Sequence, residues 1–138
     1  MKVGYQIYHL SVMMKKKIDE MYGKEEFTGR QGRLLHFILS QPESRDLFQK
    51  DIEFEFQIKK STATELLQEL EKKEYIKRVP TANDARLKKI ILLSKAESIR
   101  NKAMKDMEVL EQQLLKGINE SQQEVFLDVL KKIQQNLR

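Results

Sequence analysis

Apolar residues recur at spacings of three and four near both ends of the chain, which predicts amphipathic helices there. The first such pattern, from Val3 to Met21, predicts a helix of about five turns. Tyr5, Tyr8 and Val12 form a second apolar stripe on the same helix. Either one stripe packs on the chain's own core and the other on a partner helix, or the two form a single wide buried face.

A capping box predicts that a second helix begins after Thr28, because Gln31 stands three residues later and an apolar run follows. Pro42 disfavours the helical conformation at Gln41, so this helix should end near Ser40.

A short third helix and a longer fourth helix follow. Ile52 and Phe56 stack four residues apart in the third helix. After a short link at residues 57–58, the fourth helix begins either at Lys59 or at Thr62, where Glu65 would complete a capping box. Its apolar face consists of Ala63, Leu66, Leu67 and Leu70. Its polar face holds Ser61, Glu65, Gln68 and Lys72, flanked by Thr62 and Thr64.

Residues 75–79 and 87–93 are rich in β-branched and aromatic residues and flank a turn-like stretch, so they predict a hairpin with a long tip. A helix of about 22 residues should follow and end at Gly117, where glycine permits a left-handed cap. Ser121 and Glu124 form a second capping box, which opens a last helix. Residues 1–138 are therefore expected to form a single, mainly α domain with a winged helix-turn-helix and a two-stranded β-wing.

The positive charge of the chain is concentrated in residues 57–95. This stretch holds ten Lys or Arg residues against five acids, whereas the flanking segments are balanced and the whole chain carries +5. Concentrated positive potential attracts phosphates, so the expected partner is a polyanion.

The composition argues against catalysis and against a metal site. The absence of cysteine excludes thiol catalysis and Cys-ligated zinc, and His9 and His36 fall on separate predicted helices. We find no nucleophile elbow, glycine-rich phosphate loop or zinc-protease motif, and we expect neither an enzyme nor a cofactor. Five acids that match no hydrolase or calcium loop are expected to be surface charges: Glu25, Glu26, Asp51, Glu53 and Glu55.

The apolar stretch at the start of the chain is interrupted by polar residues and followed by Lys15, Lys16 and Lys17. It resembles neither a signal peptide nor a membrane span, so we expect a cytoplasmic protein without membrane contact.

A helix, a tight turn, a second helix and a hairpin suggest double-stranded DNA as the partner, with the second helix in the major groove. Lys59 and Lys60 should neutralise phosphates at the start of this helix. Glu65 either accepts a hydrogen bond from cytosine or only caps the helix. The side chains expected to bond base edges are Ser61, Thr62, Thr64 and Gln68.

The hairpin tip should place Arg86 in a minor groove, with Asp84 holding it by a charge-assisted bond. Lys88 and Lys89 either contact phosphates or charge an edge strand against aggregation.

Four short segments resemble the recognition helix and wing of the MarR family of bacterial transcriptional regulators. They are residues 58–64, 70–73, 75–78 and 83–94. The resemblance implies that residues 28–94 form a DNA-binding lobe and that residues 1–22 and 95–138 are dimerisation helices. It further implies a homodimer that binds a pseudo-palindromic operator, usually represses transcription, and responds to small aromatic anions bound between the dimer helices and the lobe. Asp84 and Arg86 match the wing pair of the family.

Two residues depart from the family pattern. Glu74 and Glu97 stand where glycine is common, after the recognition helix and after the second wing strand respectively. A non-glycine residue at such a turn either adopts a left-handed conformation, at a cost of about 1 kcal/mol, or the turn differs.

Two further interpretations stay open. Five residues either line a ligand pocket on the dimer side or serve core and dimer packing: Tyr5, Tyr8, His9, Met13 and Phe37. The basic stretch would also suit a winged-helix module that binds an acidic protein.

Overall fold

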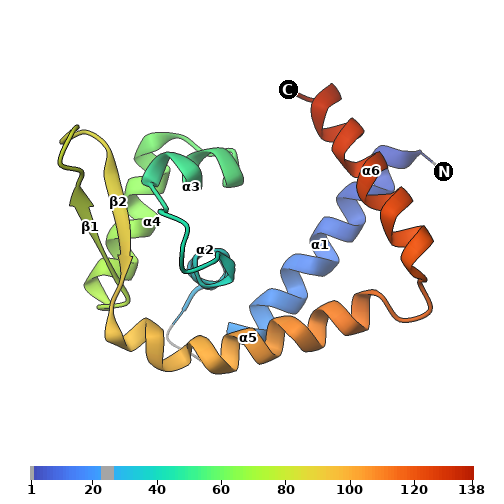
Figure 1. Ribbon diagram of the computed structural model, residues 1–138, viewed down its shortest axis with the longest axis horizontal. Helices are drawn as coiled ribbons and strands as arrows, with labels where there is room; N and C mark the ends of the chain where they lie inside the picture. Colours follow the sequence, from blue (N-terminus) through green and yellow to red (C-terminus); the bar gives the residue numbers. More distant parts are fainter. Residues whose placement is uncertain (1, 23–26) are drawn as a thin grey trace. The chain divides into compact units, whose positions relative to one another are not determined.

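The computed structural model describes residues 2–22 and 27–138, and it consists of two compact units. Glu25 and Glu26 lie outside the described residues. The first unit is Met1–Asp106 and the second is Met107–Arg138. Figure 1 labels the elements, which are α1 (Val3–Tyr22), α2 (Gly29–Ser40), α3 (Gln49–Phe56), α4 (Lys60–Lys72), β1 (Ile76–Pro80), β2 (Lys88–Leu92), α5 (Ser94–Leu114) and α6 (Glu120–Asn136).

The start and the end of α2 confirm the local prediction. The Thr28 hydroxyl accepts from the Gln31 backbone N–H at 3.3 Å, and the Gln31 side chain accepts from the Thr28 backbone N–H at 3.3 Å. These two bonds satisfy backbone donors that the first helical turn leaves free. Gln41 is extended, with ψ 145°, as expected for a residue before proline.

The core of the first unit lies between α2, α3, α4 and the hairpin. The largest fully buried side chains are Leu34, Leu35, Leu39, Ile52, Leu67, Leu70 and Ile76. Helix α4 packs against α2 and α3 and also contacts β1. The predicted apolar face of α4 is confirmed, since Ala63 is buried and Leu66 is half-buried beside the fully buried Leu67 and Leu70. The polar face opposite is therefore left at the surface.

The turn between α3 and α4 is tight, as predicted. Gln57 adopts a left-handed conformation with φ 51°, and its backbone N–H donates to Glu53 and Phe54. Helix α4 then begins at Lys60, and the Ala63 N–H already donates to the Lys59 carbonyl at 3.0 Å. The alternative start at Thr62 is thus wrong, because backbone bonding of the helix is established one turn earlier.

The two strands form the predicted antiparallel hairpin (Figure 1). Ile76 pairs with Leu92 and Pro80 with Lys88. An isolated bridge between Phe48 and Lys89 attaches the residue before α3 to β2. The wing is thereby connected to the helix-turn-helix through backbone bonds and not only through the chain.

Glu74 adopts a left-handed conformation, which is the first of the two alternatives left open for this position. Its φ is 64°, the Tyr75 N–H donates to the Leu70 carbonyl at 3.0 Å, and the Glu74 N–H donates to the Glu71 carbonyl at 3.0 Å. This bonding pattern is a Schellman motif, which satisfies the last carbonyls of α4. Glu97, in contrast, is an ordinary helical residue in the first turn of α5.

The second unit contains the end of α5, a left-handed Gly117 with φ 77°, and α6. The predicted capping box of α6 is wrong: the pair is Asn119 with Gln122, not Ser121 with Glu124. Their reciprocal bonds measure 2.9 and 3.0 Å. Asparagine caps a helix as well as serine does. After the left-handed Gly117, the chain enters α6 at Glu120, two residues before the start that a Ser121 cap would give.

Helix α1 follows the predicted length, but only its C-terminal half is covered within the first unit. Tyr22 is buried, whereas Val3, Tyr5 and Tyr8 are 64, 74 and 70% exposed. None of the helices described is both long and apolar enough to cross a membrane.

Candidate nucleic-acid interface

The N-terminal half of α4 presents a polar surface. Lys59 and Lys60 are exposed at its start, where backbone N–H groups and the helix dipole also favour anions. Ser61, Glu65 and Gln68 are exposed on the outer face, whereas Thr62 and Thr64 are half-buried on its two flanks. Lys59 caps the helix without a side-chain bond, so its ammonium group is not used in capping.

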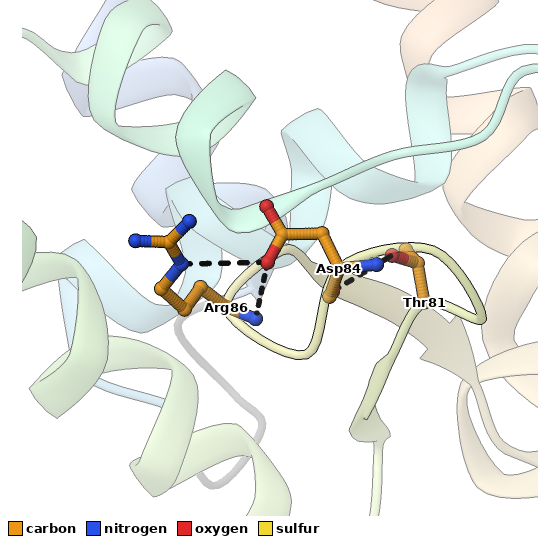
Figure 2. Close-up of polar contacts among 3 residues, drawn as sticks. All are labelled: Thr81, Asp84 and Arg86. Carbon is orange, nitrogen blue, oxygen red and sulfur yellow. Dashed lines mark hydrogen bonds and ion pairs between the residues drawn. The ribbon is translucent and has the colours of Figure 1, made fainter.

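The tip of the wing is held in shape by Thr81, Asp84 and Arg86 (Figure 2). The Thr81 hydroxyl accepts from the Asp84 N–H at 3.1 Å and donates to the Asp84 carbonyl at 2.8 Å. The Asp84 carboxylate accepts from the Arg86 backbone N–H at 2.9 Å and lies 3.5 Å from the Arg86 Nε. The bond to the backbone shapes the turn, while the long contact to the guanidinium leaves the Arg86 side chain 91% exposed.

The two lysines of β2 differ in their surroundings. Lys89 pairs with Asp46 at 3.0 Å, which ties β2 to the loop before α3. Lys88 is half-buried and pairs through its backbone with Pro80.

A polar chain that the sequence did not reveal connects the wing, α3 and α4. Arg78 in β1 donates to Glu71 at 2.7 and 2.8 Å and to the Gln49 amide oxygen at 2.8 Å. The Gln49 amide nitrogen donates to the Thr64 hydroxyl oxygen at 2.9 Å. Gln49 is only 7% exposed, and the Arg78 side chain is 16% exposed. No sequence pattern indicated these contacts, because the residues come from three different elements.

Part of the positive charge in the basic stretch is used inside the fold. Lys73 donates to the Gln31 side chain at 2.7 Å and lies 5.6 Å from the Phe27 ring. Lys95 lies 4.4 Å from the Tyr75 ring. Together with Arg78, these residues support the lobe, so the local charge excess overstates the number of cations facing a partner.

Two titratable residues meet where α1 contacts α2. His36 Nδ1 lies 3.2 Å from the Tyr22 hydroxyl, and burial lowers the pKa of this imidazole. Burial and the negative charge of Asp106 raise the pKa of Tyr22. Among residues 2–22 and 27–138, no three His, Asp or Glu side chains are grouped to hold a metal ion.

The five residues considered for a ligand pocket have different surroundings. Phe37 packs edge-on against Phe56 inside the lobe, with ring centroids 5.8 Å apart. Tyr5, Tyr8 and Met13 are exposed on α1. His9 is exposed on the same helix. Core packing therefore accounts for Phe37 but not for the other four.

Comparison with solved structures gives whole-chain matches. The structure of S. aureus MepR in a DNA-binding conformation is 27% identical, covers 100% of both chains and has a TM-score of 0.89. The transcription regulator MarR from Oenococcus oeni PSU-1 is 28% identical, covers 97% of this chain and 99% of its own, and has a TM-score of 0.81. The S. aureus MepR-DNA complex is 27% identical, covers 100% of this chain and 99% of its own, and has a TM-score of 0.81.

No curated protein sequence matches the chain. The MarR family profile matches residues 26–87, which include α2, α3, α4 and β1. This match and the structural likeness along the whole chain agree with the motifs in the recognition helix and the wing. Residues 26–87 therefore match the MarR family of transcriptional regulators, and the whole chain is similar in fold to the winged helix-turn-helix regulators named above.

Proposed function

We propose that the protein is a homodimeric, ligand-responsive repressor that binds a pseudo-palindromic DNA operator in the cytoplasm. The observation that carries this proposal is the polar face of α4, which begins with two exposed lysines and belongs to the same unit as the exposed Arg86. A helix of this kind fits the major groove of B-DNA, and an extended arginine suits a narrow minor groove. The likeness to MepR, which has been solved in complex with DNA, supports the same partner.

Each side chain then has a role in DNA binding. Lys59, Lys60 and Lys88 neutralise phosphates and set the register on the duplex. Arg86 enters the minor groove, and Asp84 keeps the wing tip in the required shape. The side chains that approach base edges in the major groove are Ser61, Thr62, Thr64, Glu65 and Gln68.

The homodimer would be held by residues 1–22 and 95–138, while residues 28–94 bind DNA. Both terminal helices carry apolar side chains that are exposed in the isolated chain. On α6, Val125, Phe126 and Leu127 are 62, 53 and 63% exposed. Tyr5 and Tyr8 on α1 are exposed to a similar degree. Surface of this kind favours association, because its burial removes apolar area from water.

A small aromatic anion is the effector class that we propose. A cavity of about 450 Å³ lies between the end of α2, β2 and the first turns of α5. Its lining combines apolar Ile38 and Leu47 with the guanidinium groups of Arg45 and Arg100. The lining also contains the carboxylates of Glu43, Asp46 and Glu97. Its volume falls within the range of roughly 300–1,000 Å³ that is usual for ligand pockets. Arg100 now binds Glu97 at 2.9 Å, so an anion would compete with that carboxylate.

Footprinting on the DNA that flanks the coding region tests the proposal. We expect protection of a two-fold symmetric site, with log affinity falling by roughly 0.9 per phosphate neutralised for each unit of log salt. Replacing Lys59 and Lys60 with Gln should lower that slope by about four, because the dimer carries two copies of each lysine. Lys132→Gln is a matched control, since Lys132 is exposed on α6 and pairs with Asp128.

Two outcomes would contradict the proposal. One is salt-insensitive binding to every fragment. The other is no specific protection together with capture of an acidic protein, which would favour the winged-helix interaction module.

For the effector, benzoate should release the operator from the wild-type protein but not from an Arg100→Ala variant.

A further inference from the structure

The polar chain that ends at Thr64 has a defined hydrogen-bond direction. An arginine side chain can only donate, so the atom of Gln49 that faces Arg78 must be the amide oxygen. The amide nitrogen then faces Thr64, and it can only donate. The orientation of this glutamine is therefore determined by its bonding partners and not by an arbitrary choice between oxygen and nitrogen.

The direction of the chain determines what Thr64 can offer to a partner. A hydroxyl group carries one proton and two acceptor sites. The Thr64 oxygen already accepts from Gln49 at 2.9 Å, so its proton must point elsewhere. Among the described residues, no side chain or carbonyl takes that proton. Thr64 is half-buried on the flank of α4, next to the exposed Gln68.

Arg78 and Gln49 are well placed to hold this direction. Glu71 binds Arg78 through both Nε and Nη2, at 2.8 and 2.7 Å. This paired contact restricts rotation of the guanidinium group. Gln49 is buried at the first residue of α3, where water has little access to compete for its amide. Because Arg78 and Gln49 are each held by a second partner, the network favours one arrangement over the alternatives.

We propose that Thr64 acts as a hydrogen-bond donor that selects a base acceptor in the major groove, and that Gln49 and Arg78 are positioning residues for it. This inference rests on the proposed DNA-binding function and adds a preference at one base pair of each half-site. The acceptors presented there are N7 and O6 of guanine, N7 of adenine and O4 of thymine. The amino groups of cytosine and adenine are donors and would be disfavoured. A serine or threonine without such a partner could read either kind of group.

The test begins with selection of binding sites from randomised duplexes by the wild-type protein. Thr64→Val keeps the shape of the side chain and removes the hydroxyl group. It should reduce the base preference at one position of each half-site by on the order of tenfold. Thr64→Ser should restore most of that preference. The salt dependence of binding should be the same for all three proteins, because phosphate contacts are unchanged.

Gln49→Glu reverses the direction of the chain while keeping the length of the side chain. One carboxylate oxygen would accept from Arg78 and the other from the Thr64 hydroxyl, which would then turn its proton inward. Thr64 would offer only acceptor sites to DNA. We expect the preference at the same position to move toward cytosine or adenine amino groups. A carboxylate in the first turn of α3 also suits the helix dipole, so the lobe should fold.

The outcomes separate this inference from the proposed function. If the wild-type protein selects no sequence at all, the proposed function fails. If the wild-type protein selects a site but Thr64→Val selects the same site with the same stringency, only the role of Thr64 is overturned. If Thr64→Val loses the preference but Gln49→Glu keeps it unchanged, the positioning role of Gln49 is overturned. Equal thermal melting of the variants would show that a change in preference does not arise from misfolding.

Discussion

The first compact unit, Met1–Asp106, and helix α6 use apolar residues in opposite ways. In the lobe, Leu34, Leu35, Leu67 and Leu70 are each 0% exposed. In α6, by contrast, none of the described residues is buried, and Leu127 is 63% exposed. Full burial of a leucine stabilises a fold by about 1.5–3 kcal/mol relative to exposure. The first unit can therefore complete its own core, to which Ala96 and Ala103 of α5 also contribute, whereas the apolar surface of α6 favours association.

The same difference appears along α1. Its C-terminal end packs on α2 through Tyr22, which contacts Gly32 so closely that a Cβ atom there would lie 3.0 Å from the Tyr22 Cβ. The Asp19 carboxylate reinforces this joint by accepting from Arg33 at 2.7 Å. The N-terminal half has no such neighbours within its unit. One helix is thus anchored in the lobe at one end and exposes apolar residues at the other, as expected for an element that joins a folded lobe to a partner.

The largest effect should come from placing charge on the exposed face of α6. Phe126→Glu combined with Val129→Glu should convert the proposed dimer to a monomer and weaken operator binding by roughly 100-fold or more, because the two half-sites would no longer be bound together. Sedimentation and operator titration measure both effects. Gln135→Glu on the same helix is the matched control, since it adds one charge at an exposed polar position. A wild-type protein that sediments as a monomer at micromolar concentration would remove the basis for this prediction.

A core substitution in the lobe should have a smaller but still large effect on stability. Leu67→Ala should reduce the free energy of unfolding by about 2–5 kcal/mol, because it leaves a cavity among fully packed side chains. Denaturant unfolding measures the change. Gln68→Ala, one residue further along α4 and exposed, should alter the free energy of unfolding by less than about 0.5 kcal/mol. Equal effects of the two changes would show that the lobe core is not closed as described.

Two substitutions to glycine should change the stability of the protein in opposite directions, one within the lobe and one at its edge. Glu74→Gly should stabilise the protein by roughly 0.5–1 kcal/mol, because it removes the cost of a left-handed conformation at φ 64°. Glu97→Gly should destabilise by about 1 kcal/mol, because position 97 is helical and Glu97 also binds Arg100. Thermal melting of the two variants measures the difference. The same sign for both would contradict the assigned conformation of one of these residues.

The smallest effect should be the pH dependence at the joint between α1 and α2. Burial lowers the pKa of His36, so the folded protein favours the neutral imidazole. The contribution of His36 to the free energy of unfolding is complete above the unfolded pKa of about 6.5. It is lost as the pH falls below that value, because the unfolded chain then binds the proton more readily than the folded protein. Denaturation midpoints between pH 7.5 and 5.5 should therefore fall less steeply for His36→Gln than for the wild type.

His9 provides the control for that measurement, because it is exposed on α1. His9→Gln should keep the wild-type slope. If both variants flatten the pH dependence equally, the effect does not come from the buried joint.

Local patterns predicted the elements of the lobe well. The capping box at Thr28, the effect of Pro42 on Gln41 and the apolar face of α4 each depend on residues within one or two helical turns, and the structure confirms them. The family resemblance left two alternatives open at position 74, and the structure decides for the left-handed conformation. The capping box of α6 was misplaced because two competing boxes lie two residues apart, and the backbone at Gly117 decides between them.

The sequence by itself determined the order of the elements, their buried faces and the location of the basic stretch, because these follow from periodicity and charge between near neighbours. Tertiary structure alone decided which polar side chains meet. Gln49 and Arg78 are 29 positions apart, yet they share a hydrogen bond of 2.8 Å. Lys73 lies 5.6 Å from the Phe27 ring and Lys95 lies 4.4 Å from the Tyr75 ring, although these residues are far apart in the sequence. Such contacts depend on how helices and strands pack, and spacing along the chain does not encode that packing.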